Sequence, residues 1–167
     1  MAADVTRLTE DPRTVQFKPG ADLRNQDLRG QDLSGLRLSG ACLAGANLSG
    51  ANLKGCYLDA ADLQGADFTG ADLEFAVLGG AHLDDAIFCK ANLKRSNLVG
   101  AQGTNADFSG ADLYYARPGN ARFPNAIFRD AHIERTIFRR ADLRGADFRG
   151  ASGNGNFDRA NLEGVQR

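Results

Sequence analysis

The sequence repeats every five residues. Between Gly40 and Gly55 the same order recurs three times: a small residue, a polar residue, Leu, a variable residue and Gly. Five matches neither the helical period of 3.6 nor the strand period of 2. We call the third residue of each unit its centre. Centres fall at every fifth position from 23 to 153, and Leu, Phe or Ile occupies 24 of these 27 positions. Ala lies two residues before the centre in 21 of the 27 units.

The residue types within a unit predict its conformation. In extended backbone, residues two apart point to the same side. The small residue and the centre should therefore both point inward, and the Asp or Asn between them should point outward. The fifth residue is often Gly, which suits a sharp turn of the chain. Each unit is predicted to form one short extended side followed by a corner.

The phenylalanines indicate how many units make one turn. Five phenylalanines occupy centres that are 20 residues apart, at Phe68, Phe88, Phe108, Phe128 and Phe148. This spacing predicts a coil of four units. The five rings should form a core ladder, stacked one coil above another on the same inner wall.

Aspartates support the same coil length. Asp precedes the centre at 27, 67, 107 and 147, and again at 32, 72 and 112, so that both series step by 40 residues. In stacked parallel strands the residue 20 positions later lies about 4.8 Å away. Like charges at that distance repel each other. Placing Asp on alternate coils avoids this repulsion.

These units resemble the pentapeptide repeat family, whose signature is A(D/N)LXX. The signature is matched in full by Ala46–Gly50, Ala61–Gly65 and Ala141–Gly145, and the resemblance covers residues 21–152. It implies an all-β fold, a right-handed quadrilateral parallel β-helix. Twenty-seven units give about seven coils of 20 residues, a rod roughly 32 Å long at about 4.8 Å per coil.

Three segments follow from this pattern. Residues 1–20 precede the repeat and are predicted to form a cap, in which Asp4 begins a short helix over Val5–Glu10. A terminal repeat needs such a lid over its apolar end. Residues 21–153 are predicted to form the β-helix. After Gly153 the phase slips by one residue, so that 154–167 are expected to form a distorted half-coil that covers the end or leaves it open for a partner.

The repeat is broken at the centres Gly103, Pro118 and Gly153. Gly103 is expected to leave an inner site empty, and Pro118 removes a hydrogen-bond donor from the ladder. Two interpretations stay open. The breaks are either local irregularities or binding loops at 101–105 and 116–120, since binding residues concentrate on loops.

The sequence indicates neither catalysis nor a bound cofactor or metal. His82 and His132 should point outward on different sides, without ligands at metal-binding spacing. Cys56 takes an inward small-residue position and is interpreted as inert filling. Three cysteines give no paired disulfide framework, which favours a reducing compartment. With no secretory signal or membrane-spanning stretch, we expect a cytoplasmic protein. With no catalytic grouping of residues, we expect that it is not an enzyme.

One corner carries alternating aromatic and basic residues. Reading every twentieth residue gives Phe75, Arg95, Tyr115 and Arg135, close enough for cation–π contacts. The neighbouring column includes Tyr114 among alternating charges. These columns either stabilise the rod or anchor a partner through large aromatics. The candidate interaction surface therefore consists of Phe75, Arg95, Tyr114, Tyr115, Arg135, Gly103 and Pro118.

A rod-like scaffold for protein–protein interaction, with an unknown partner, is the function that this sequence favours. The alternative comes from the resemblance, because quinolone-resistance members mimic DNA and bind DNA gyrase. The aspartates that would form such a surface are Asp22, Asp27, Asp32, Asp62, Asp67, Asp72, Asp107, Asp112, Asp142 and Asp147. A net charge of −1 and an arginine-rich C-terminal end argue against it. Nucleic-acid binding by that end is disfavoured, because interleaved Asp should neutralise the arginines. The expected state is a monomer or an end-to-end dimer.

Overall fold

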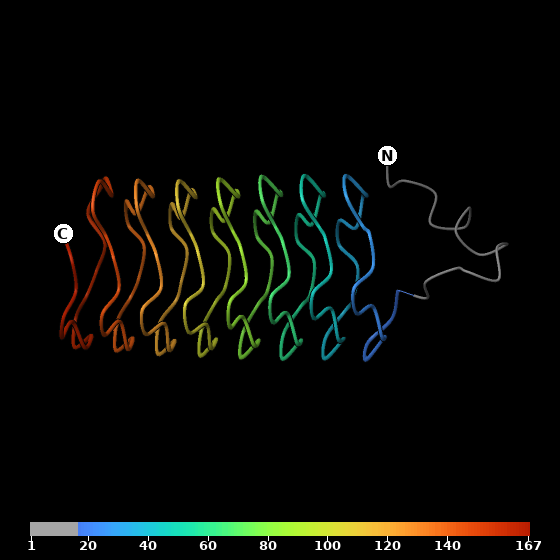
Figure 1. Cartoon of the computed structure of the whole chain (residues 1–167), viewed down its shortest axis with the longest axis horizontal. Helices are drawn as coiled ribbons and strands as arrows, with labels where there is room; N and C mark the ends of the chain where they lie inside the picture. The colour runs from blue at the N-terminus through green and yellow to red at the C-terminus, as the bar shows by residue number, and fades with distance from the viewer. Residues whose placement is uncertain (1–16) are drawn as a thin grey trace, which may run out of the picture.

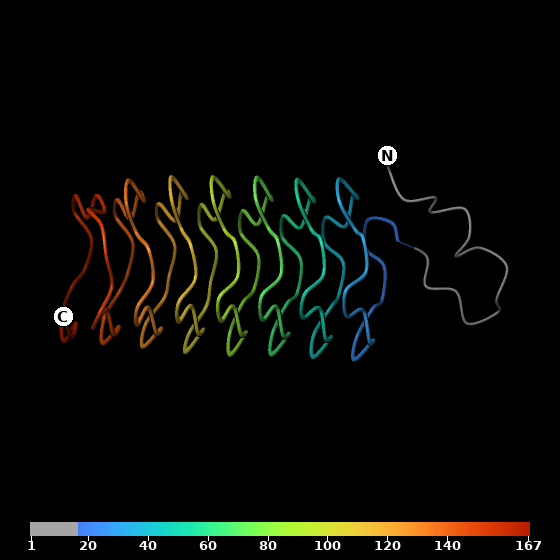
Figure 2. The same cartoon turned by 90° about the horizontal axis from the view of Figure 1, so that it is seen from above.

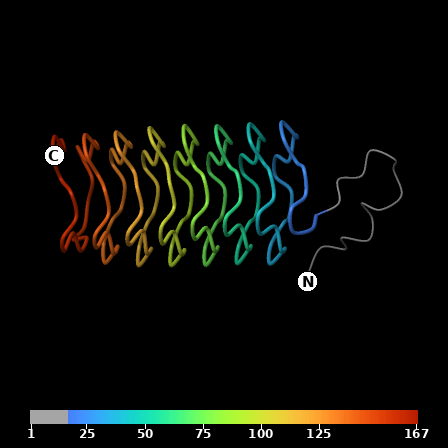
Figure 3. The same cartoon turned by 90° about the horizontal axis from the view of Figure 1, so that it is seen from below.

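The computed structural model describes residues 17–167, which wind into a rod of stacked coils. Figure 1 shows the coils following one another along the long axis, from blue near residue 20 to red at the C-terminus. The views from above and below show the same stacking (Figures 2 and 3). The predicted helix over Val5–Glu10 lies outside the described residues.

Between residues 17 and 167 the structure contains no helix and no continuous strand; each unit instead contributes a single β-bridge residue. Every bridge is parallel, and up to the pair His132 and Ser152 it joins residues 20 positions apart, as with Asp27 and Asn47. This spacing confirms that four units make one coil. The total number of coils and the N-terminal helical cap stay predictions.

Backbone hydrogen bonds explain why the units stack so regularly. The centre Leu48 donates its N–H to the carbonyl of Asp67 at 2.7 Å, and Asn47 donates to Gln26 on the other side at 2.9 Å. Within the unit, the Ala51 N–H donates to the Leu48 carbonyl at 3.0 Å and closes the corner. The fifth residue, Gly50, has φ of 65°, a left-handed conformation that glycine adopts without strain.

The core is a column of inward-facing alanines and centres, and the predicted phenylalanine ladder is confirmed. Successive rings from Phe68 to Phe148 stack with their centres 4.6–4.9 Å apart and within 8° of parallel. Phe68, Phe88, Phe108 and Phe128 are fully buried, and Phe148 is 7% exposed. The spacing of the rings equals that of the strands, so one ring fills each coil on this wall.

The prediction that Gly103 leaves an inner site empty is wrong. Phe123 occupies the centre one coil later, and its ring lies so close that a Cβ at position 103 would be 2.9 Å from Cδ1 and Cε1. Phe123 is 1% exposed and its ring also contacts Phe108, with ring centres 5.4 Å apart. The missing side chain of one coil is therefore replaced by an oversized side chain of the next.

The binding-loop interpretation of the breaks is also wrong. Gly103 and Pro118 are buried, and both units keep the five-residue spacing and left-handed corners, with φ of 58° at Asn105 and 54° at Asn120. Proline has no N–H, so Pro118 cannot donate to the carbonyl of Ile137. The bonds beside it persist, since the Ile137 N–H donates to Ala116 at 2.9 Å. One missing hydrogen bond is too small a change to push the chain outward.

Beyond Gly153 the bridges shorten to a 19-residue step. The pairs are Ile137 with Asn156, Asp142 with Asn161, and Asp147 with Gln166. The one-residue phase slip is thereby confirmed. Gly153 itself has φ of 90°, and a Cβ there would approach the backbone N of Glu134 to 2.6 Å. The segment boundaries at residues 20 and 153 stay predictions.

Candidate interaction surface

The corner with alternating aromatic and basic residues is built from two cation–π pairs. The guanidinium carbon of Arg95 lies 5.4 Å from the ring centre of Phe75, and that of Arg135 lies 5.2 Å from the ring centre of Tyr115. Arg135 also donates a hydrogen bond to the Tyr115 hydroxyl. We call Phe75, Arg95, Tyr115 and Arg135 the aromatic corner. The contacts expected along this column are thus present, as two pairs and not as one continuous stack.

All four members of the aromatic corner have a left-handed backbone. Their φ values are 60°, 56°, 57° and 58° in chain order. Glycine or Asn accepts this conformation readily, whereas a bulky side chain there is an outlier. Phe75 and Tyr115 are the aromatic residues among the described non-glycine positions with positive φ. Their place at the corner is therefore set by tertiary contacts and not by local preference.

Tyr114 joins the corner to a network of charged groups. Its ring meets Tyr115 edge-on, with centres 4.6 Å apart, and stacks on His132 at 5.9 Å. His132 Nδ1 lies 3.1 Å from Asp112, which also pairs with the Lys94 ammonium at 3.0 Å. The network fixes the orientation of Tyr114 beside the corner.

Burial revises which aromatics face solvent. Phe75 is 46% exposed, whereas Tyr114 and Tyr115 are half-buried. Tyr57, which the sequence analysis did not single out, is 42% exposed and lies under Arg37, whose guanidinium carbon is 5.5 Å from the ring centre. Its outward second position in the unit is the signal that could have identified it. Gly103 and Pro118, being buried, offer no side chain to this surface.

Many aspartates are neutralised within the rod. An Asp at the second position and an Arg at the fourth pair with each other, for example Asp22 with Arg24 at 2.6 Å and Asp142 with Arg144 at 2.8 Å. Asp147 is 6% exposed and binds both Arg149 and Arg129. The expected neutralisation of the arginine-rich end is confirmed at these residues. Hydrogen bonds from Arg24 lower the pKa of Asp22 to about 2, and those from Arg29 lower the pKa of Asp27 to about 2.

These depressed pKa values predict how stability changes in acid. The pKa of Asp in an unfolded chain is about 3.9. The Asp22–Arg24 and Asp27–Arg29 pairs therefore stabilise the rod above that pH and lose their contribution as the pH falls toward about 2. We expect the Asp22→Asn, Asp27→Asn double variant to show a shallower loss of thermal stability between about pH 4 and pH 2 than the unmodified chain. Asp130→Asn is the control, because no ion pair to Asp130 occurs in residues 17–167. Equal slopes for all three proteins would contradict this.

Two of the three thiols are held in the protonated form by burial. Burial raises the pKa of Cys56 to about 12 and that of Cys89 to about 11, so both are protonated at neutral pH. Cys56 is fully buried, as its interpretation as filling requires. Within the described part of the chain no three His, Cys, Asp or Glu side chains gather in a way that could hold a metal ion.

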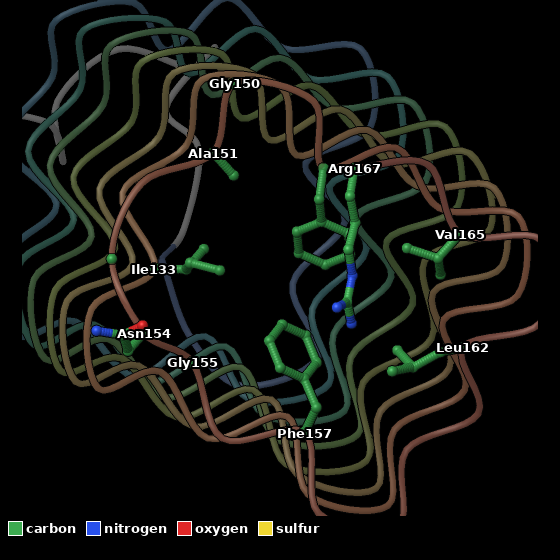
Figure 4. A pocket seen from close by; sticks show the side chains of 11 residues that line it. Ile133, Gly150, Ala151, Asn154, Gly155, Phe157, Leu162, Val165 and Arg167 are labelled. Carbon is green, nitrogen blue, oxygen red and sulfur yellow. The ribbon is translucent and has the colours of Figure 1, made fainter.

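A hollow of about 330 Å³ lies at the last coil (Figure 4). The view shows Ile133, Phe157, Leu162 and Val165 directed toward the interior of the coil. The Arg167 guanidinium lies 5.8 Å from the ring centre of Phe157. Apolar side chains line the hollow together with Asn154 and Arg167.

The chain belongs to the pentapeptide repeat family. The family model, "Pentapeptide repeats", matches in eight copies over residues 19–50, 37–74, 66–102, 86–117 and 119–152. Proteins of this family are generally structural or binding proteins and not enzymes. The scaffold-type fold inferred from the repeat is thereby established.

Solved structures share the fold. HetL of the cyanobacterium Nostoc sp. strain PCC 7120, a pentapeptide repeat protein involved in heterocyst differentiation regulation, is 23% identical with a TM-score of 0.67. The alignment covers 91% of this chain and 89% of HetL. A trypsin-treated form of QnrB1, a plasmid-mediated fluoroquinolone resistance protein, is 23% identical with a TM-score of 0.52, over 91% of this chain and 84% of QnrB1. These neighbours are right-handed β-helix proteins, as the resemblance implies.

Comparison with curated proteins gave no match. Among residues 17–167 there is no helix of the length and apolarity that crossing a membrane requires.

Proposed function

We propose that this protein is a non-enzymatic, rod-shaped scaffold that binds a protein partner through the aromatic corner and the adjoining Tyr114. The observation that carries the proposal is the left-handed backbone at Phe75 and Tyr115. Holding a bulky residue in that conformation costs of order 1–3 kcal/mol, and such strain concentrates at functional positions. Every other corner of these coils uses Gly, Asn or another residue without an aromatic ring.

The composition of the corner supports the same proposal. Aromatic residues and Arg are the types most enriched at the energetic centres of protein interfaces. Phe75 is 46% exposed although its ring is among the largest apolar groups on the rod. Because backbone hydrogen bonds join each coil to its neighbours throughout the described rod, a partner would meet a preformed surface. Three free thiols agree with a cytoplasmic location, which we include in the proposal.

The test is capture of a partner from a lysate of the source cells on the full chain. We expect a specific protein to bind the unmodified rod and to be lost from the Tyr114→Ala, Tyr115→Ala double variant. Thr69→Ala, a change to an exposed residue on another wall, serves as the control and should retain it. Identical captured proteins for all three rods, identified by mass spectrometry, would refute a role for the corner. Turnover of a substrate by the purified chain would refute the non-enzymatic assignment.

The alternative, DNA mimicry toward gyrase, is favoured by the likeness to QnrB1 in fold only. Half of the ten candidate aspartates are in ion pairs with Arg or Lys, namely Asp22, Asp27, Asp112, Asp142 and Asp147. Paired carboxylates present little negative field to a DNA-binding groove. Protection of gyrase from a quinolone in a supercoiling assay would establish this alternative. The oligomeric state, a monomer or an end-to-end dimer, stays a prediction.

A further inference from the structure

One wall of the rod is more apolar than the others. It consists of the units 56–60, 76–80, 96–100 and 116–120, and we call it the smooth face. In the described chain four large hydrophobic side chains are exposed, and three border this wall: Tyr57 at 42%, Val99 at 39%, and Phe75 at 46% on the adjoining corner. Single exposed hydrophobic residues are ordinary, but a cluster on one wall indicates a binding surface.

The smooth face is also flat. Tyr57, Val77, Asn97 and Arg117 bridge one another in a single column along its outward second positions. Glycine occupies 79, 80 and 100 near its other edge, so that no side chain rises between Val77 and Val99. A Cβ at Gly79 would lie 3.6 Å from the Val99 carbonyl oxygen, in ordinary contact with the wall. The apolar groups therefore form an open floor that an extended segment could cross.

Positive charges without acidic partners border this floor. In the described part of the chain no carboxylate lies within 4.0 Å of a guanidinium nitrogen of Arg95 or Arg117, whereas Arg144 and Arg149 are each ion-paired. Glu74, which lies near Arg95, is bound to Lys54 at 2.7 Å. Asp59, in unit 56–60, is the one acidic residue of the smooth face, and it accepts a hydrogen bond from the Ser39 hydroxyl at 2.7 Å. The units 76–80, 96–100 and 116–120 contain no Asp or Glu. The part of the face beside Arg95 and Arg117 is thus electrostatically complementary to an anionic partner.

A backbone donor adds to this polarity. In many units a second-position Asp or Asn accepts the N–H of the fourth residue, as Asp107 does from Ser109 at 2.8 Å. Val77 has no such acceptor, and the N–H of Gly79 has no hydrogen-bond partner within residues 17–167. Asn97 accepts from Val99 at 3.0 Å, whereas the N–H of Gly119, like that of Gly79, has no partner in this part of the chain. Approaching carboxylate or carbonyl oxygens would satisfy these donors.

We propose that the smooth face binds an extended acidic segment of a protein partner, in which carboxylates alternate with apolar side chains. The inference rests on the proposed scaffold function and names the chemistry of the partner. Carboxylates would engage Arg95 and Arg117, whose planar guanidinium groups bind them in bidentate fashion. Apolar side chains would pack on Val77, Val99 and Tyr57. The aromatic corner forms one edge of the same surface.

Nucleic acid is the other polyanion to consider, and the face fits it less well. Affinity for a phosphate backbone arises from many Lys and Arg contacts at once. The units 56–60, 76–80, 96–100 and 116–120 contain one Arg and no Lys. Most residues of these four units are apolar or glycine. Such a surface suits a peptide in which charged residues are separated by apolar ones better than it suits a continuous phosphate backbone.

The experiment is selection of a random peptide library on the full, folded chain, followed by affinity measurement with fluorescently labelled synthetic peptides. We expect the recovered peptides to be rich in Asp and Glu together with Leu, Phe or Val, and to bind more weakly as salt increases. The Arg95→Glu, Arg117→Glu double variant should weaken binding at least about tenfold. Arg122→Glu is the matched control. Arg122 is exposed and, like Arg117, occupies the second position of its unit, but it lies on the neighbouring wall. It should leave the affinity unchanged.

Three results would overturn the inference. They are recovery of no binding peptide, recovery of peptides whose affinity is the same for the double variant, and displacement of the peptide by a tighter-binding oligothymidylate. The scaffold proposal is judged separately. If the Tyr114→Ala, Tyr115→Ala rod loses its captured partner while a rod carrying Arg117→Glu alone keeps it, the aromatic corner binds the partner and the smooth face does not.

Discussion

Replacing Phe108 with alanine is expected to lower the free energy of unfolding by about 3–5 kcal/mol, the usual effect of removing a buried Phe ring. Phe108 is fully buried. Its ring centre lies 4.9 Å from those of both Phe88 and Phe128 and 5.4 Å from that of Phe123. In a solenoid each coil is stabilised by its two neighbours, so a cavity here weakens both interfaces of one coil.

The measurement is urea unfolding followed by far-ultraviolet circular dichroism. Phe108→Leu is the matched control, because Leu28 and Leu48 occupy the same wall in earlier coils. It conserves most of the volume and should lower the free energy of unfolding by less than about 1.5 kcal/mol. A Phe108→Ala variant as stable as Phe108→Leu would show that the ladder is not a principal source of stability.

Restoring the consensus Leu at Gly103 is expected to destabilise the rod by about 1–3 kcal/mol, the usual result of overpacking a filled core. The sequence pattern alone leads to the opposite expectation, that a Leu would fill a vacancy. In the structure the ring of Phe123 already occupies that space, 2.9 Å from where a Cβ would stand. The new side chain would displace the ring or shift the coil.

A second substitution separates overpacking from any other effect at Gly103. Phe123→Leu alone should also destabilise, by about 1–3 kcal/mol, because with Gly103 beneath it nothing else fills the space that the ring leaves. The Gly103→Leu, Phe123→Leu double variant recreates the all-leucine column of Leu43, Leu63 and Leu83. It should recover most of the lost stability, with a coupling of about 0.5–3 kcal/mol in the double-mutant cycle. Additive losses in urea unfolding would contradict the exchange of volume between the two coils.

Much of the fold could be predicted because the pattern is local. Side-chain direction within a five-residue unit depends on neighbouring backbone angles, so the inward Ala and Leu and the outward Asp follow from their positions. The 20-residue recurrence of Phe then fixed the number of walls. Alternation of Asp27, Asn47 and Asp67 along one column was likewise readable, and the structure adds direct bonds of this kind, such as Asn92 to Asp72 at 2.8 Å.

The candidate site was predicted less completely. The pairs of the aromatic corner followed from reading every twentieth residue, and the structure places Arg95 over Phe75 accordingly. The exposure of Tyr57 and the half-burial of Tyr115 could not be predicted from the repeat. Exposure depends on the way in which the long side chains of adjacent coils cover one another. Gly103 and Pro118 were assigned to a surface although both are buried.

The sequence by itself determined the unit, the four-walled coil and the stacked ring ladder, since each follows from residue types that recur at a fixed spacing along the chain. Only the tertiary structure decided that Phe123 fills the place of the side chain missing at Gly103, and that Asp147 is held by Arg129 as well as Arg149. It also decided that Glu74 is paired with Lys54, so that Arg95 forms no ion pair within the described chain. The physical reason is that these properties belong to contacts between coils, where ring volume and the reach of arginine side chains select one arrangement among several that the repeat allows.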